Sequence, residues 1–277
     1  MNARLSVNFV DGATVSAADR GFTYGDGLFE TLRVVAGRVP LWDRHMARLR
    51  AGCERLRLPL PDVDALRLEA SRLCEGLDDA VVRITWSRGE GERGYALPSR
   101  PHPTLVLSAA PLALDASAYD EGIAVRLCET RLATQPLLAG MKHLNRLEQV
   151  MARAEWSDAA YGEGLVRDMA GHVVCATAAN LFAVFGDRWA TPPVEACGVA
   201  GVARAEVLAW REVAVEAITP GRLMAADEVF LTSAVRGILP VRACAGRSWT
   251  PGPATRALQA HWRTLGLPLP TMEGFPK

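Results

Sequence analysis

One lysine stands apart among the basic residues of this 277-residue chain. Of its 31 lysines and arginines, 29 are arginine, and the two lysines are Lys142 and the terminal Lys277. Lys142 lies in the stretch LLAGMKHLNRLEQV, residues 137–150. Arginine serves as well as lysine for solvation, ion pairing or phosphate binding, whereas Schiff-base formation and proton abstraction by a neutral amine require lysine. The composition therefore favours an amine role for Lys142, with an ordinary surface cation as the alternative.

A glycine-rich stretch, SRGEGERGY at residues 87–95, offers a second kind of chemistry. Its three glycines make the loop flexible enough to close on a ligand. The guanidinium of Arg93 can grip a carboxylate through two parallel hydrogen bonds, with Tyr95 beside it. The alternative is a mobile surface loop with one exposed arginine.

The lysine motif GMKHLNRLEQV resembles that of the fold-type IV pyridoxal-phosphate enzymes, the class-IV aminotransferase family. Six further segments resemble landmarks of this family, in the expected order and over nearly the whole chain. The resemblance implies an α+β fold of the D-amino-acid aminotransferase type, with two α/β domains and the cofactor in the cleft between them. The six segments are ADRGFTYGDGLFETLRV (18–34), RHMARL (44–49), SRGEGERGY (87–95), ATAANLFAV (176–184), GVAGVAR (198–204) and LTSAVRGILPV (231–241).

The same resemblance implies a set of cofactor contacts. Lys142 would bind pyridoxal 5'-phosphate as a Schiff base and, once released by the substrate, act as general acid and base. Arg48 would hold the cofactor phosphate, a solvated helix cation being the alternative. The segment GVAGVAR opens a predicted helix, whose first amides suit an anion. The implied cofactor-binding residues are Lys142, Arg48, Cys175, Gly201, Val202, Ala203, Thr232 and Ser233, although Thr232 and Ser233 also fit a plain strand end.

Three residues are implied on the substrate side. Arg93 and Tyr95 would bind a substrate carboxylate, and the hydroxyl of Thr31 would contact substrate and assist the proton transfers of Lys142. Taken alone, a threonine in an apolar strand is more often structural. Asn145 is expected to cap the helix that follows it, with Glu148 completing a capping box.

Cys175 departs from the family pattern. Members normally carry a glutamate five residues before the asparagine of ANLF, where it pairs with the protonated pyridine nitrogen; here that position is Cys175. A thiol near neutral pH is a weak donor and strengthens the electron sink less than a carboxylate does. Three interpretations are open. The reaction is slower but still fast enough, Thr177 or water makes a substitute contact to the pyridine nitrogen, or the reaction itself is different.

Within the family, the motifs most resemble those of the 4-amino-4-deoxychorismate lyases, which form 4-aminobenzoate and pyruvate on the way to folate. The R-x-H sequence typical of D-amino-acid aminotransferases is replaced by Arg93-Gly94-Tyr95, and the EGxR pattern of branched-chain enzymes by residues 30–33, ETLR. We therefore expect proton abstraction by Lys142 from the substrate's external Schiff base, then elimination of pyruvate and aromatisation. The alternatives are a branched-chain or D-amino-acid aminotransferase, and an inactive homologue that only binds the cofactor.

The elements that must position these residues follow from apolar periodicity and turn residues. The pattern predicts an opening hairpin with its turn at Asp11-Gly12, and turns at Ala170-Gly171 and Gly186-Asp187 between later strands. We expect a small N-terminal α/β domain over 1–112, a linker over 113–121 and a larger C-terminal α/β domain over 122–277. Helices are predicted over 39–60 and 63–77, from near 145, and near 201–212 and 254–265; strands are predicted within 79–97, 103–112, 123–132, 163–192 and 227–241.

Composition narrows the class of protein further. Zero net charge favours neither nucleic acid nor a membrane surface as partner. The amino terminus lacks the pattern of a signal peptide, and no apolar run is long enough to span a bilayer. The six scattered cysteines fit buried core thiols in a reducing cytoplasm. The histidines are isolated, so the sequence does not indicate a metal site. We expect a cytoplasmic enzyme acting on a small molecule, and the family resemblance implies a homodimer.

Overall fold

The computed structural model describes residues 4–272, which form two compact units. The first unit runs to Ala113 and also includes Met141–Asn145. The second comprises Leu114–Gly140 and the chain from Arg146 onward. The lysine segment therefore groups with the first unit, although it lies inside the range 122–277 that we predicted for the second domain.

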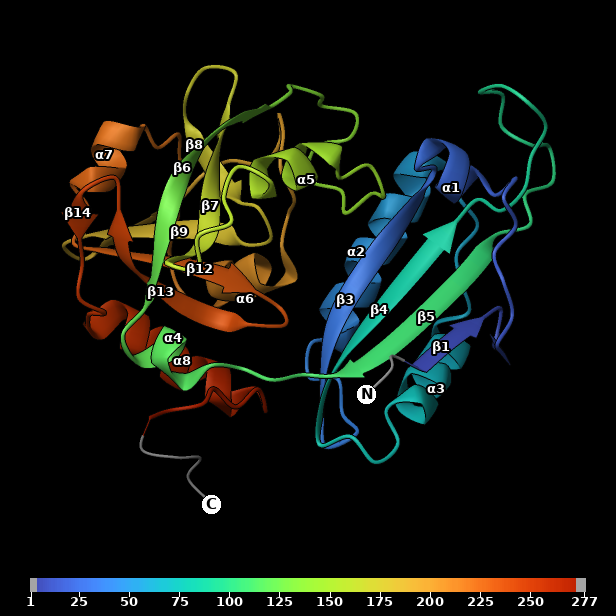
Figure 1. Cartoon of the computed structure of the whole chain (residues 1–277), viewed down its shortest axis with the longest axis horizontal. Coiled ribbons are helices and arrows are strands. Elements are labelled where there is room, and N and C mark those ends of the chain that lie inside the picture. The colour runs from blue at the N-terminus through green and yellow to red at the C-terminus, as the bar shows by residue number, and fades with distance from the viewer. Residues whose placement is uncertain (1–3, 273–277) are drawn as a thin grey trace. The chain divides into compact units, whose positions relative to one another are not determined.

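The first unit is an antiparallel sheet of five strands, in the order β2-β1-β5-β4-β3, with two helices packed on one face (Figure 1). Alternate strand residues and the apolar sides of the helices build one core between sheet and helices. The elements are β1 (Arg4–Val7), β2 (Val10–Asp11), α1 (Arg20–Tyr24), β3 (Gly27–Val35), α2 (Trp42–Leu56), α3 (Val63–Leu73), β4 (Asp79–Ser87) and β5 (Thr104–Pro111).

Helix α2 shows why the sequence folds this way locally. Trp42, Met46, Leu49 and Cys53 recur at helical spacing, and all four are buried in the core of the unit. Burying an apolar side chain of this size stabilises the fold by about 1.5–3 kcal/mol. The helix ends at Arg57, whose φ of 51° places it in the left-handed region typical of a C-terminal cap.

The second unit is built on a mixed sheet of nine strands, most of them in the order β11-β10-β9-β12-β13-β6-β7-β8, with β14 paired to β13. Because β8 pairs with both β7 and β9, the strands from β9 to β8 close into a barrel-like ring. The elements are α4 (Ala116–Asp120), β6 (Ile123–Leu132), α5 (Leu147–Arg153), β7 (Tyr161–Asp168), β8 (Val173–Ala176), β9 (Asn180–Phe185), β10 (Arg188–Thr191), α6 (Val202–Trp210), β11 (Ala214–Val215), α7 (Pro220–Met224), β12 (Glu228–Ser233), β13 (Gly237–Cys244), β14 (Arg247–Ser248) and α8 (Pro253–Thr264).

The opening hairpin turns at Asn8 and Phe9, so the predicted turn at Asp11-Gly12 is wrong. Val7 pairs with Val10, and the two residues between them have φ angles of 50° and 66°. Two positive φ angles in a two-residue loop are typical of a type I′ turn. A phenylalanine rarely takes a positive φ, and the sequence therefore carried no signal for this turn.

The segment predicted as a linker contains helix α4, whose N-cap Asp115 accepts a hydrogen bond from the Ser117 amide. The capping box at the start of α5 is wrong, because the N-cap is Arg146 and has no side-chain hydrogen bond to the helix. Asn145 instead donates to the Gly25 carbonyl at 3.0 Å, which ties the lysine segment to α1.

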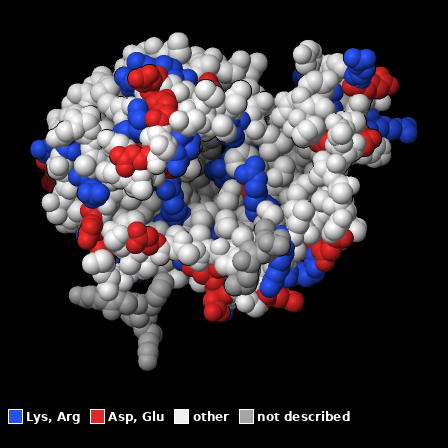
Figure 2. All heavy atoms as spheres, in the orientation of Figure 1, with Lys and Arg blue, Asp and Glu red and all other residues white. Residues whose placement is uncertain are grey.

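The charge pattern agrees with the zero net charge of the sequence. Acidic and basic side chains are interspersed over the face shown in Figure 2. All six cysteines are buried and carry free thiols, as predicted. Within residues 4–272, no helix is long and apolar enough to cross a membrane.

Gly89, at the start of the glycine-rich loop, lies very close to a neighbouring backbone segment. A Cβ there would lie 1.7 Å from the His102 carbonyl oxygen, whereas nothing lies within 4 Å of a Cβ on Gly37; both residues have positive φ. We expect Gly37→Ala to cost about 1–2 kcal/mol through backbone strain alone, and Gly89→Ala to cost clearly more. Thermal unfolding of the two variants measures the difference, and equal melting temperatures would contradict the close approach.

Candidate active site

The lysine segment Met141–Asn145 lies antiparallel along the outer edge of β3. The Phe29 amide donates to the Lys142 carbonyl at 2.9 Å, and the Leu144 amide donates to the Gly27 carbonyl at 3.0 Å. Lys142 is half-buried, and its Nζ lies 4.1 Å from the centroid of the Phe29 ring. The pairing therefore places the amine over an aromatic side chain of the first unit.

Phe29 belongs to the sheet face that the helices leave uncovered. We call this the open face, formed by Phe29, Thr31, Arg83, Thr85 and Ser108. Strand neighbours of these residues point into the helix-covered core, so alternation puts the five on the other side. Thr31 lies directly opposite Arg83 on β4, which lies opposite Ser108 on β5. Lys142 and Thr31, predicted as the catalytic pair, thus share one face.

Arg83 is a residue of this face that the sequence analysis missed. Its guanidinium carbon lies 4.0 Å from the centroid of the Phe29 ring, so Phe29 carries both this cation and the Lys142 amine. The Arg83 guanidinium can offer an anionic ligand two parallel hydrogen bonds. The available signal was a lone arginine alternating with the core residues Val82 and Ile84 in a strand.

Glu30 joins β3 to α2 through a buried ion pair. Its carboxylate accepts from Arg48 Nε at 2.8 Å, from Arg48 Nη2 at 2.5 Å and from His45 Nδ1 at 2.6 Å. Burial alone would raise the pKa of Glu30, but the Arg48 guanidinium and the His45 hydrogen bond outweigh it and lower the pKa to about 2. Burial also lowers the pKa of His45, so its ring is a neutral hydrogen-bond donor to Glu30. Arg48, the predicted phosphate ligand, is thereby held in a fixed orientation.

In the second unit, the predicted cofactor contacts gather around Asn180, another residue that the sequence analysis did not single out. Asn180 pairs with Cys175 on β8 and with Thr232 on β12. A Cβ on Gly201 would lie 2.0 Å from Asn180 Oδ1, so only glycine fits there. Asn180 also donates to the Val199 carbonyl at 2.9 Å, which fixes the chain entering α6.

The start of α6 and Thr232 fit an anion such as a phosphate. Gly201 caps α6 without a side-chain hydrogen bond, and the first amides of a helix have no acceptor inside it. Thr232 is 1% exposed, and its Oγ1 has no hydrogen-bond partner among the described residues. A buried hydroxyl without a partner is unfavourable, and a phosphate oxygen would satisfy it. Ser233 differs, since its Oγ accepts from the Arg236 amide at 3.1 Å.

Cys175 lies in the same ring of strands as a neutral thiol. Burial raises the pKa of Cys175 to about 12, so it carries no charge near neutral pH. The carboxylate in this part of the barrel belongs to Glu163 on β7, which is buried. Glu163 accepts from Thr177 Oγ1 at 2.5 Å and from Arg236 Nη2 at 2.6 Å. Thr177, a suggested substitute for the missing glutamate, is thus engaged by Glu163, which the sequence analysis also missed.

Arg93 and Tyr95 lie in the loop after β4, in the first unit. Both side chains are exposed, that of Tyr95 by 85%. The Tyr95 ring packs on Tyr24 of α1, with centroids 5.4 Å apart. The loop therefore presents Arg93 to solvent next to a contact with α1.

The comparisons with known proteins place this chain in the class IV aminotransferase family. Residues 27–244 match the family model described as amino-transferase class IV. The chain is 34% identical over 268 residues to aminodeoxychorismate lyase of Vibrio harveyi, covering 93% of this chain and 99% of that protein. The family and the fold inferred from the sequence are thus confirmed.

Solved structures agree with this placement. The crystal structure of 4-amino-4-deoxychorismate lyase from Pseudomonas aeruginosa is 46% identical, with a TM-score of 0.89 over 94% of this chain and 98% of that chain. The T.th. branched-chain amino acid aminotransferase, solved with pyridoxamine 5'-phosphate, has the same fold at 21% identity, a TM-score of 0.83, and coverage of 94% and 92%.

The ion pair at Glu30 predicts a pH-dependent stability. Glu30→Gln removes the negative charge from the buried pair with Arg48, so we expect the free energy of unfolding at neutral pH to fall by about 3–5 kcal/mol. Glu30 has a lower pKa in the folded chain, about 2 against 4.5, and its stabilisation is therefore full above about pH 5 and lost as the pH falls toward 2.

Urea unfolding of wild type and Glu30→Gln at several pH values measures this. The difference between them should shrink between about pH 5 and pH 3. Glu54→Gln, on the exposed side of the same helix, is the control and should change stability by less than about 0.5 kcal/mol. A difference that stays constant with pH would contradict the assigned ion pair.

Proposed function

We propose that this protein is a pyridoxal-phosphate-dependent lyase that converts 4-amino-4-deoxychorismate to 4-aminobenzoate and pyruvate, a step toward folate. One observation carries the proposal: Lys142, the only lysine before the last residue, lies over Phe29 on the same sheet face as Thr31 and Arg83. The 46% identity to the lyase from Pseudomonas aeruginosa supports the choice of this activity within the family.

The residues of the chain divide into a group that binds the cofactor and a group that handles the substrate. Lys142 holds the cofactor covalently, and Arg48, oriented by Glu30, contributes positive charge for its phosphate. The start of α6 at Gly201 and the Thr232 hydroxyl supply uncharged donors for the same group. The remaining members of the proposed cofactor set are Val202, Ala203, Ser233 and Cys175.

Proton transfer is the task of Lys142 and Thr31. When bound, pyridoxal phosphate withdraws electrons and makes the C–H beside the substrate nitrogen acidic. The Lys142 amine, once free of the cofactor, takes this proton, and the Thr31 hydroxyl on the same face assists its transfer. The C–O bond to the enolpyruvyl group then breaks, the ring becomes aromatic, and the departing enolpyruvate takes up a proton to give pyruvate.

The two carboxylates of this substrate explain the need for arginines. Arg83 on the open face is suited to grip one carboxylate near Lys142. Arg93, with Tyr95 beside it, is the candidate for binding a carboxylate from the glycine-rich loop. A neutral thiol at Cys175 favours elimination over amino transfer, because aromatisation drives the elimination and relies less on a protonated ring nitrogen.

The assembly and location of the enzyme are also proposed. We infer a homodimer in the cytoplasm that acts on a small molecule and binds neither nucleic acid nor membrane. Six buried free thiols suit a reducing compartment. The dimer rests on the family resemblance alone.

The activity is tested by incubating the cofactor-loaded protein with 4-amino-4-deoxychorismate and measuring 4-aminobenzoate. Lys142→Arg keeps the charge but cannot form a Schiff base, so we expect a loss of at least about 10³-fold. Borohydride reduction followed by peptide mass spectrometry should find the cofactor on Lys142 of the wild type. Amino transfer from an amino acid to 2-oxoglutarate without aminobenzoate release would instead indicate an aminotransferase, and bound cofactor without either turnover an inactive homologue.

The Thr232→Val variant tests whether Thr232 binds the cofactor phosphate or has only a structural role. The variant removes an unpartnered buried hydroxyl, so we expect the apoprotein to be as stable as wild type or slightly more stable. Loss of a hydrogen bond to a charged phosphate should weaken cofactor binding about tenfold or more. Fluorescence titration and thermal unfolding of the apoprotein measure the two effects.

Ser233→Ala is the comparison for apoprotein stability, because the Ser233 hydroxyl already has a partner within the protein. The Ser233 hydroxyl has a partner in the Arg236 amide, so its removal should lower the stability of the apoprotein. If Thr232→Val destabilised the apoprotein and left cofactor affinity unchanged, the phosphate role would be wrong.

A further inference from the structure

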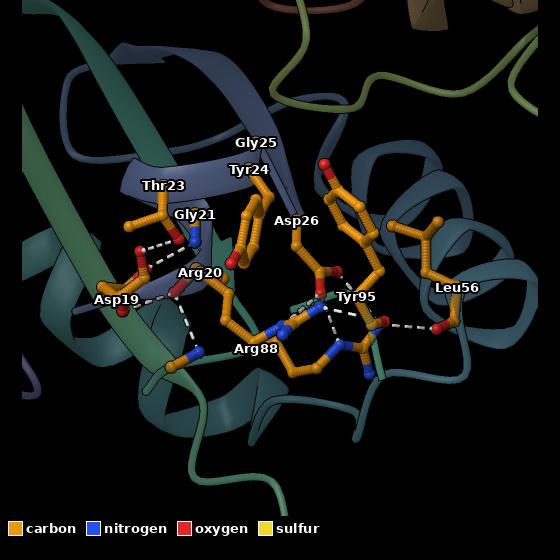
Figure 3. A network of polar contacts seen from close by, with 12 residues as sticks. Asp19, Arg20, Gly21, Thr23, Tyr24, Gly25, Asp26, Leu56, Arg88 and Tyr95 are labelled. Carbon is orange, nitrogen blue, oxygen red and sulfur yellow. Dashed lines mark hydrogen bonds and ion pairs between the residues drawn. The ribbon is translucent and has the colours of Figure 1, made fainter. Parts of the chain in front are cut away.

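Two buried arginines of the first unit share one aspartate. Asp26, just after α1, accepts from Arg20 Nε at 2.9 Å and from Arg88 Nε and Nη2 at 2.8 and 3.0 Å. Arg20 and Arg88 are only 3% and 2% exposed. Burial alone would raise the pKa of Asp26, but the two guanidiniums reverse this and lower it, so the aspartate is ionised. Figure 3 shows the two arginines converging on Asp26.

One carboxylate cannot neutralise two buried guanidiniums. The excess positive charge requires further acceptors, because a buried charge without partners is strongly unfavourable. Arg88 finds them at the end of α2, where it donates to the Leu56 and Arg57 carbonyls at 2.7 and 3.0 Å. Arg20 finds them in the glycine-rich loop, at the Gly94 carbonyl at 3.1 Å and, more weakly, at the Tyr95 carbonyl at 3.5 Å.

Other contacts of α1 converge on the same stretch of loop. The Arg20 amide donates to the Gly89 carbonyl at 2.9 Å, and the Tyr24 hydroxyl accepts from the Gly94 amide at 3.3 Å. The Arg20 guanidinium lies over the Tyr24 ring, 4.9 Å from its centroid, and that ring contacts Tyr95 (Figure 3). The large apolar side chains of this part of the loop do not hold it in place, since Tyr95 and Leu97 are both exposed. Gly89 is also bridged to His102, but the stretch from Gly91 to Tyr95 depends on polar contacts to α1.

We propose that Arg20 is a positioning residue for substrate binding: it fixes the backbone on the carboxyl side of Arg93 and so holds that guanidinium where it meets a substrate carboxylate. The inference rests on the proposed function, in which Arg93 binds the substrate. Arg20 stays buried only while the Gly94 and Tyr95 carbonyls lie against it. The ordered loop and the buried Arg20 consequently stabilise each other, and without Arg20 the ordering entropy of a loop rich in glycine opposes substrate binding.

Arg20→Lys is the first test. Lysine keeps the charge beside Asp26 but cannot bridge the aspartate and two loop carbonyls at once. We expect KM for 4-amino-4-deoxychorismate to rise about tenfold while kcat changes less than about twofold, since a loss of binding common to ground and transition state raises KM alone. Trypsin should cut faster after Arg93 in the substrate-free variant, because the loop opens more often.

Two companion variants separate positioning from general damage. Arg88→Lys weakens the same aspartate cluster, but the Arg88 side chain bonds Asp26 and the end of α2 rather than the Gly94 and Tyr95 carbonyls. It should therefore lower the melting temperature while the trypsin rate after Arg93 stays near wild type. Gly91→Ala keeps the arginine at position 20 but displaces its side chain, because the new Cβ would lie 2.9 Å from Arg20 Cδ. Gly91 does not have a positive φ, so the substitution adds no backbone strain. This variant should reproduce the raised KM and faster cleavage even if Arg20→Lys fails to fold.

The outcomes are distinguishable from failure of the proposed function. If 4-aminobenzoate is formed and neither KM nor the trypsin rate changes in Arg20→Lys and Gly91→Ala, the positioning role is overturned while the function stands. If no aminobenzoate is formed by wild type, the proposed function fails and the substrate role of Arg20 fails with it. Equal effects of Arg20→Lys and Arg88→Lys on the trypsin rate would also overturn the inference, because they would indicate loosening of the whole cluster.

Discussion

Pairing of the lysine segment with β3 is the contact on which the candidate site depends. Two backbone hydrogen bonds, between Phe29 and Lys142 and between Leu144 and Gly27, add residues distant in sequence to the edge of the first unit's sheet. Because strand neighbours alternate between faces, this register puts Lys142 on the open face with Thr31. A slip of one residue would turn the amine toward the helices. Asn145 secures the register by its hydrogen bond to Gly25.

Two of the buried charge clusters of the first unit involve acids at the start of β3 or just before it. Glu30 neutralises Arg48 on α2, and Asp26 serves Arg20 and Arg88. Both acids lie within the single motif that runs from α1 into β3. This motif consequently orients the cation proposed for the cofactor phosphate and the loop proposed for the substrate. Its glycines also leave room for the approach of the lysine segment, since a Cβ on Gly25 or Gly27 would collide with it.

Much of the secondary structure followed from local patterns, because burial on one side imposes a regular period. The helix predicted over 39–60 was observed as α2, and the strand predicted over 123–132 as β6. At Asn145 the error arose because the residue's partner lies far away in sequence, whereas the hairpin turn was missed because Phe9 takes a positive φ. Asn145 resembles a helix cap, but its amide is bound by Gly25 in another motif, and no local pattern reveals that competition.

Dependence on distant partners also decided which residues of the candidate site could be recognised in the sequence. Lys142 could be singled out because its chemistry differs from that of the arginines around it. Arg83 and Glu163 could not, because their significance depends on strand pairing and on which face each strand exposes. Asn180 is similar: it borders Cys175, Thr232 and Gly201 only after the barrel closes through the pairing of β8 with β9.

The charges around Cys175 in the second unit bear on the choice between lyase and aminotransferase chemistry. The thiol is neutral, and the nearby carboxylate of Glu163 is already bound by Thr177 and Arg236. Rotating Glu163 toward a ring nitrogen would leave Arg236 without that partner and leave Thr177 without its acceptor, which opposes such a substitution. A weak electron sink is tolerable only if the reaction has another driving force. Aromatisation of the substrate supplies one, whereas reversible amino transfer does not, so the replacement of glutamate by Cys175 and the proposed lyase chemistry are mutually consistent.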